Sequence, residues 1–100
     1  MTLTNIKTQQ HSYDADRELL LKRMRRIEGQ AKGIQKMLEE GRYCIDVVQQ
    51  LNAISSAADE VALRILQDHI EGCVADAIRH ERGDEYIKEL MATIRKAMKR

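Results

Sequence analysis

The chain contains no proline, and its apolar residues recur at helical spacing over most of its length. From Leu20 to Leu38 these residues follow one another at steps of four and three, and the same pattern runs from Val47 to Ile65. Steps of three and four place side chains on one face of an α-helix. Because no proline removes a helical hydrogen bond, neither stretch is forced to break. The pattern therefore predicts two long helices, each with one apolar stripe.

Capping residues and glycines give the expected ends of the first helix. Asp14 is placed to cap its start. Gly41 follows the stripe and is expected to end the helix, because glycine adopts the left-handed conformation without steric cost. The residues before Asp14 are polar and show no periodicity. We therefore expect a flexible tail over residues 1–13 and a single all-α domain over residues 14–100.

Two further helices are expected after Gly41. One begins near Tyr43 or Cys44 and runs to about His80, with Gly72 as its weak point. The stop-and-start signal around Gly83 leads into a third helix over about residues 84–99.

The side chains available for a core favour an assembly over a monomer. The 100 residues include no Trp or Phe and three Tyr. Elongated helices with aliphatic stripes and no large core residues enclose little core by themselves, so we expect the stripes to be buried against another copy of the chain.

The sequence also indicates where the protein acts and what chemistry its two thiols can take part in. No apolar run is long enough to span a membrane, and the first residues lack the apolar core of a signal peptide. We therefore expect a cytoplasmic protein without a membrane partner. The two cysteines should stay reduced there, which favours metal or redox chemistry over a structural disulfide.

His69 and Cys73 are the central candidates for a site, because residues four apart lie on the same face of a helix. Cys44 precedes His69 by 25 residues, which is about 37 Å along a continuous helix. Either the helix breaks and folds back, or Cys44 reaches the pair from an antiparallel second copy. The unbroken stripe over residues 47–65 favours the second arrangement.

Two thiolates and one imidazole form a soft ligand set. Such a set suits Cu(I) with three ligands, or Zn(II) and Ni(II) with a fourth. His11 or a backbone amine in the expected tail is available as that fourth ligand. The three residues alone do not separate these metals, and core packing explains a half-apolar His and a buried Cys about equally well.

The net charge of +1 hides an uneven distribution. Residues 1–43 carry nine Lys/Arg against six Asp/Glu, residues 44–87 carry three against nine, and residues 88–100 carry five against one. The densest basic stretch runs from Arg17 to Lys36. Two interpretations are open: a surface that contacts DNA phosphates, or a helix face that is simply solvated. No helix-turn-helix spacing accompanies it. Most of its cations, including Arg26, are expected to lie away from the apolar stripe. The candidates for DNA binding are Arg17, Lys22, Arg23, Arg25, Arg26 and Lys32.

Several linked motifs resemble one family. They are Arg25-Arg26-Ile27-Glu28-Gly29-Gln30, Lys32-Gly33-Ile34, Arg42-Tyr43-Cys44-Ile45-Asp46, Asp59-Glu60-Val61-Ala62-Leu63, and His69 with Cys73. In order and spacing they resemble the CsoR/RcnR group of bacterial metal-responsive transcriptional repressors, over about residues 17–98.

The resemblance implies a three-helix protomer with two long antiparallel helices. It implies an antiparallel four-helix-bundle dimer and a dimer of dimers that binds operator DNA without metal. Metal binding would lower the DNA affinity and derepress copper efflux or homeostasis genes. Cys44 of one protomer, with His69 and Cys73 of its partner, would hold Cu(I). Tyr43 and Glu89 match a pair that couples ligand geometry to helix movement, and Arg23 with its neighbours matches the DNA-facing surface.

Several positions bear on how this chain compares with the branches of the family. Glu60 stands where some members use a basic residue for DNA binding. The N-terminal histidine ligand of nickel and cobalt sensors falls at Ser12, with His11 one residue away. One nickel/cobalt branch has histidine in place of Cys73, persulfide sensors lack the equivalent of His69, and formaldehyde sensors lack the second thiol. The copper-sensing branch fits best.

The sequence therefore predicts a Cu(I)-responsive repressor that is not an enzyme. The alternatives are a Ni(II)-responsive repressor with an extra N-terminal ligand, and a repressor that senses persulfide or thiol oxidation. A copper-buffering or purely helical scaffold protein would bind metal without DNA. A Cys–His enzyme is the weakest reading, because no acid partner or oxyanion loop accompanies the pair.

Overall fold

The structure, a computed structural model, describes residues 12–99, and within them it contains helices and turns but no strand. This confirms the prediction of an all-α fold. Its contacts divide these residues into two compact units, one of residues 15–65 and one of residues 12–14 with 66–99. The elements are η1 (Ser12–Asp16, a 3-10 turn), α2 (Arg17–Glu39), α3 (Cys44–Asp68), η2 (His69–Val74, a π-helix), α4 (Ala75–Arg79) and α5 (Gly83–Met98).

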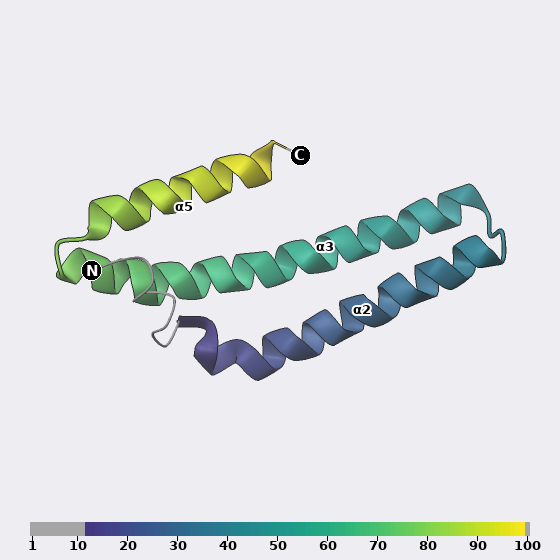
Figure 1. Cartoon of the computed structure of the whole chain (residues 1–100), viewed down its shortest axis with the longest axis horizontal. Helices are drawn as coiled ribbons and strands as arrows, with labels where there is room; N and C mark the ends of the chain where they lie inside the picture. Colours follow the sequence, from purple (N-terminus) through teal and green to yellow (C-terminus); the bar gives the residue numbers. More distant parts are fainter. Residues whose placement is uncertain (1–11, 100) are drawn as a thin grey trace. The chain divides into compact units, whose positions relative to one another are not determined.

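The unit of residues 15–65 is a helical hairpin. In it α2 and the first part of α3 lie side by side and run in opposite directions (Figure 1). Its buried core consists of Leu20 and Ile34 from α2 and Val47 and Val61 from α3. Other residues of the apolar stripes remain exposed to solvent in a single chain; Leu38, for example, is 64% exposed. The hairpin therefore buries only part of the stripes that the sequence presents.

The start of α2 differs from the expectation. Asp14 was expected to cap the helix, but α2 begins at Arg17, after the 3-10 turn η1. The N-cap residue Asp16 makes no capping hydrogen bond, because its carboxylate accepts from Arg64 Nε at 2.8 Å. This partly exposed ion pair joins the end of η1 to α3 and contributes at most about 1 kcal/mol. The expected tail lies outside the described residues as far as His11, while Ser12 and Tyr13 belong to η1.

The end of α2 confirms the role predicted for Gly41. Gly41 has φ of +67°. The Arg42 N–H donates to the Met37 carbonyl at 2.9 Å, and the Gly41 N–H donates to the Leu38 carbonyl at 3.2 Å. This is a Schellman motif, in which a left-handed residue allows the last carbonyls of the helix to find donors.

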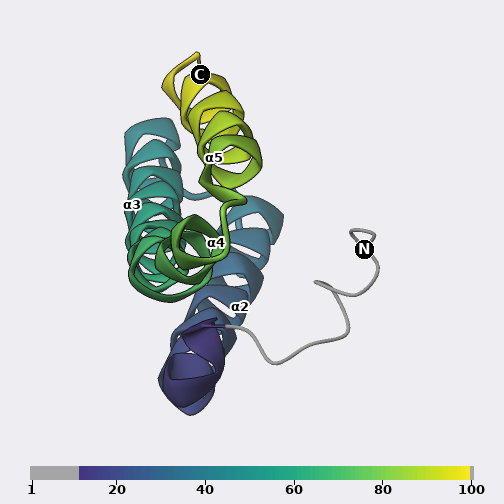
Figure 2. The same cartoon turned by 90° about the vertical axis from the view of Figure 1, so that its left-hand side faces the viewer.

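The second unit contains η2, α4 and α5, which contact one another. In Figure 2, α5 rises from the end of α4 after a short turn. Val74 and Ala77 are buried. One row of α5, formed by Tyr86, Leu90 and Ile94, is half-buried, whereas the neighbouring Ile87, Met91 and Met98 are exposed. No helix within residues 12–99 is long and apolar enough to cross a membrane.

The turn before α5 lies at the break that the sequence predicts around Gly83. Glu81, and not Gly83, takes the left-handed conformation, with φ of +61°. The Arg82 N–H donates to the Ala77 carbonyl at 2.6 Å, which closes a second Schellman motif. Gly83 begins α5 instead, and a Cβ there would lie 2.7 Å from Cγ1 of Ile78. Close packing, and not turn geometry, requires this glycine.

Two substitutions in this turn should change the stability in opposite directions. Glu81→Gly should raise the free energy of unfolding by about 0.5–1 kcal/mol, because glycine removes the steric cost of the left-handed conformation. Gly83→Ala should lower it, because the added methyl group meets Ile78. Urea unfolding followed by circular dichroism measures both. Stabilisation by Gly83→Ala, or destabilisation by Glu81→Gly, would contradict this description of the turn.

Candidate metal centre and nucleic-acid surface

His69 and Cys73 lie in the same π-helical segment, η2, and both are half-buried. The sequence predicted α-helix here, with Gly72 as its weak point, and the helix changes type in this segment. A π turn holds more residues than the 3.6 of an α turn. Residues four apart therefore come closer to lying directly above one another. The spacing puts the His69 and Cys73 side chains on the same face of the segment.

Ser12 lies against the Cys73 side of this segment. The Ser12 Oγ and the Cys73 Sγ are 3.0 Å apart and hydrogen-bonded. A Cβ on Gly72 would lie 2.7 Å from the Ser12 Cβ, so Gly72 provides the space that Ser12 occupies. Ser12 occupies the position at which nickel and cobalt sensors of the family are expected to carry an additional histidine ligand. His11, the other candidate, lies outside the described residues.

Tyr86 covers the His69 side and was not among the predicted site residues. The two rings are stacked, with centroids 6.1 Å apart and planes 22° apart. The Arg82 guanidinium carbon lies 5.8 Å from the Tyr86 centroid. Burial raises the pKa of Tyr86, and the positive charge of Arg82 partly offsets that effect. Because the stack joins η2 to α5, the orientation of the imidazole depends on the packing of α5.

Cys44 is the first residue of α3, and its thiol is free and exposed. Among residues 12–99 no three His, Cys, Asp or Glu side chains gather closely enough to hold a metal ion. Each chain therefore presents the pair of His69 and Cys73 and, separately, one thiol. The donor types fit a soft metal ion, and the described part of one chain leaves the set incomplete.

The two residues expected to support the site lie in different elements. Tyr43 lies in the turn before α3, is 68% exposed, and accepts the Val47 N–H at its carbonyl. Glu89 lies on α5 with an exposed side chain, and its backbone carbonyl accepts the Thr93 hydroxyl at 3.0 Å. Their predicted coupling role stays a prediction.

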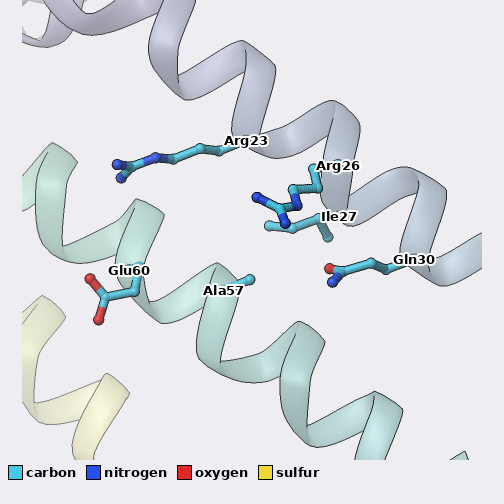
Figure 3. Close-up of a pocket in the computed structure, with 6 residues that line it drawn as sticks. All are labelled: Arg23, Arg26, Ile27, Gln30, Ala57 and Glu60. Atoms are coloured by element: carbon cyan, nitrogen blue, oxygen red, sulfur yellow. The ribbon is translucent and has the colours of Figure 1, made fainter.

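The basic residues of α2 divide into two groups. Successive helical residues are separated by about 100°, which puts Lys22, Arg25 and Lys32 on the side opposite the buried stripe. Arg23 and Arg26 instead extend toward α3 (Figure 3). Arg26 is exposed and, at about 100° per residue, lies beside the apolar stripe and not in it. Its spacing of three from Arg23 and four from Gln30 places these residues in one row.

That row lines a pocket of about 300 Å³ between α2 and α3, within the unit of residues 15–65. Glu60 extends from α3 on the other side (Figure 3). The side-chain oxygen Oε1 of Gln30 is buried and has no hydrogen-bond partner within residues 12–99. The lining residues are Arg23, Arg26, Ile27, Gln30, Ala57 and Glu60.

Comparisons with known proteins identify the family of the chain. The chain is 42% identical to the copper-sensing transcriptional repressor CsoR of Bacillus subtilis over 93 residues, which cover 93% of this chain and 92% of that protein. The crystal structure of the copper-sensing repressor CsoR with Cu(I) from Geobacillus thermodenitrificans matches with a TM-score of 0.82 and 43% identity, covering 86% of this chain and 90% of that chain.

A second solved structure, that of the nickel-responsive transcriptional regulator InrS, matches with a TM-score of 0.69 and 33% identity, covering 79% of this chain and 89% of that chain. Residues 16–96 match the family described as metal-sensitive transcriptional repressors. This agreement in sequence and fold confirms the predicted family and a regulatory, non-enzymatic role. The chain belongs to the metal-sensitive transcriptional repressor family.

Proposed function

We propose that this chain is a Cu(I)-responsive transcriptional repressor, which binds operator DNA without metal and leaves it when copper binds. Such a protein acts in the cytoplasm and derepresses copper efflux or homeostasis genes. The observation that carries the proposal is the placement of His69 and Cys73 on one π turn, with the exposed Cys44 thiol at the start of α3. The similarity to a Cu(I)-bound CsoR structure supports the choice of metal.

The complete metal site would be shared between two copies of the chain. In an antiparallel pair, the start of one α3 faces the end of the other, so twofold symmetry generates two equivalent sites. The exposed apolar residues of α3 support this pairing, because Ile45, Val48 and Leu51 are each about half exposed in a single chain. Pairing of two such dimers would give the homotetramer that binds DNA.

Cu(I), when bound, supplies a soft centre that is satisfied by two thiolates and one imidazole. Cys44, Cys73 and His69 would hold it. The thiols must lose their protons for this, and so affinity should fall at low pH. Within one chain, Ser12 is placed to donate a hydrogen bond to the Cys73 sulfur, and Tyr86 holds the plane of the His69 ring. We expect Tyr43 and Glu89 to support the site from outside it.

The DNA surface would be built from the exposed cations of α2, namely Arg17, Lys22, Arg23, Arg25, Arg26 and Lys32. Their contacts with phosphates make the affinity depend steeply on salt. Metal shifts the protein away from DNA only if it binds the DNA-free arrangement more tightly. The coupling is reciprocal, so operator DNA must weaken copper binding by the same factor.

A nickel-responsive repressor is the second candidate. The specific observation in its favour is that Ser12 lies within hydrogen-bonding distance of Cys73, so the N-terminal segment can reach the metal site. Similarity to the nickel-responsive regulator InrS agrees with it. Anaerobic titration with Cu(I) and with Ni(II), followed by DNA release, distinguishes the two metals. X-ray absorption then distinguishes a three-coordinate site from a four-coordinate planar one.

Cys44→Ala should bind operator DNA like the wild type but should not release it on addition of Cu(I). The reason is that the substitution removes one thiolate of the site and touches no cation of α2. Fluorescence anisotropy of a labelled operator duplex under anaerobic conditions measures both properties. Gln49→Ala, an exposed change on the same helix, is the matched control and should release DNA normally. Copper-dependent release by Cys44→Ala would show that the site is assigned wrongly.

Gly72→Ala should make Cys73 more reactive toward iodoacetamide in the metal-free protein. The added methyl group displaces Ser12 and exposes the sulfur that Ser12 contacts. Mass spectrometry of peptides gives the alkylation rates of both cysteines, and the exposed Cys44 thiol is the internal reference. Ser12→Ala should raise the Cys73 rate less, because the backbone of the turn remains in place. An unchanged ratio of the two rates in Gly72→Ala would refute this packing.

A further inference from the structure

The pocket between α2 and α3 contains charges of both signs. Arg23 and Arg26 extend into it from α2, and Glu60 extends from α3 (Figure 3). No ion pair joins these residues within the described part of the chain. The pocket volume is about 300 Å³, whereas a cavity needs only about 10–15 Å³ to hold one water molecule. A phosphate group with some of its waters therefore fits.

The donors in this pocket suit a phosphate oxygen. Guanidinium groups present paired N–H donors in a plane that matches phosphate geometry. Gln30 adds a side-chain amide whose buried Oε1 has no hydrogen-bond partner among residues 12–99. Since the oxygen and nitrogen of an amide are exchanged by a half-turn of the group, its NH₂ is available as a further donor.

The surroundings favour a phosphate of DNA over a free anion. Lys22 is exposed and precedes Arg26 by four residues, so the two side chains are neighbours on the surface of α2. A polyanion that follows this helix meets several cations in succession, whereas a free anion meets only the pocket. Glu60 opposes any anion that enters, because like charges in proximity repel.

We propose that one backbone phosphate of the operator enters this pocket between Arg23 and Arg26, and that Glu60 weakens that contact and so sets the strength of operator binding. The inference rests on the proposed function, because it concerns the same DNA surface. The role of Glu60 would be to keep the affinity for DNA low enough that metal binding releases the operator. A ligand with a limited coupling energy releases a weakly bound operator more completely than a tightly bound one.

Glu60→Gln tests the proposal, because it removes the charge and keeps the size of the side chain. An interaction between exposed charges changes an equilibrium by roughly 1.4- to 5-fold, so two protomers facing DNA should together bind roughly 2- to 30-fold more tightly at low salt. Anisotropy titrations of a labelled duplex over a range of KCl concentrations measure the gain. Glu40→Gln, which removes an exposed charge at the end of α2, is the control and should change little.

The double variant Glu60→Gln/Arg23→Gln locates the effect. If the pocket is responsible, the gain from Glu60→Gln should shrink or vanish in the Arg23→Gln background, whereas the same double variant built with Lys36→Gln should keep it. A gain of equal size in all backgrounds would mean a general charge effect and would overturn the proposal. So would a Glu60→Gln protein whose DNA affinity equals that of the wild type.

Inorganic phosphate distinguishes the two sources of the anion. At matched ionic strength, phosphate should compete with DNA no better than chloride does, because a free anion lacks the neighbouring contacts. Stronger competition by phosphate would identify the pocket as a site for a free anion and would overturn the proposal. Absence of salt-dependent DNA binding by the wild type would instead contradict the proposed function itself.

Discussion

The length of α3 is the constraint on which the proposed site depends. The helix has 25 residues and begins at Cys44, and the segment with His69 and Cys73 follows it. At about 1.5 Å per residue it is about 37 Å long, far more than the span of a metal site. The whole of α3 therefore lies, along the chain, between the Cys44 thiol and the other two proposed donors. For this reason we infer that a second copy of the chain completes the ligand set, and that metal binding depends on the arrangement of two protomers.

The distribution of apolar residues on α3 agrees with that requirement. Val47 and Val61 are buried within the hairpin, whereas Leu51 and Leu63 are at least half exposed in one chain. A helix that is apolar on more than one side is stable in water only when a further surface covers it. We infer that the helix which separates the donors also provides the interface that brings them together.

Around η2, single contacts connect the two proposed metal donors, His69 and Cys73, to other segments. Ser12 bonds to Cys73, and Tyr86 stacks on His69. A movement of Cys73 would therefore displace Ser12 in the N-terminal turn, and a movement of His69 would displace Tyr86 on α5. Through these two direct contacts, metal binding at the proposed site would alter how η1 and α5 pack around η2.

The sequence predicts the helices well, because they depend on local spacing. The ligand set of the proposed site also follows from local spacing and stays a prediction. The stripes identified the long helices, and Gly41 marked the end of α2. Tyr86 was missed as a neighbour of His69, since a ring stack between η2 and α5 leaves no signal in local spacing. Its membership in the row with Leu90 and Ile94 was the one available sign.

Other differences have the same origin. The signal around Gly83 predicts the break before α5 but not its geometry: Glu81 takes the left-handed position, and packing against Ile78 requires the glycine. The π geometry of η2 and the pocket beside Arg26 likewise depend on contacts between elements. Spacing along the chain does not report such contacts.

Complementation between two defective chains tests the shared site most directly. Cys44→Ala and Cys73→Ala would be mixed, unfolded and refolded together, and Cu(I) affinity would be measured by competition with a colorimetric chelator. Each variant alone should lack the tight site. In mixed dimers, one of the two sites regains Cys44 from one chain and His69 with Cys73 from the other, so tight binding should return. A mixture that binds Cu(I) no more tightly than the separate variants would contradict a site shared between protomers.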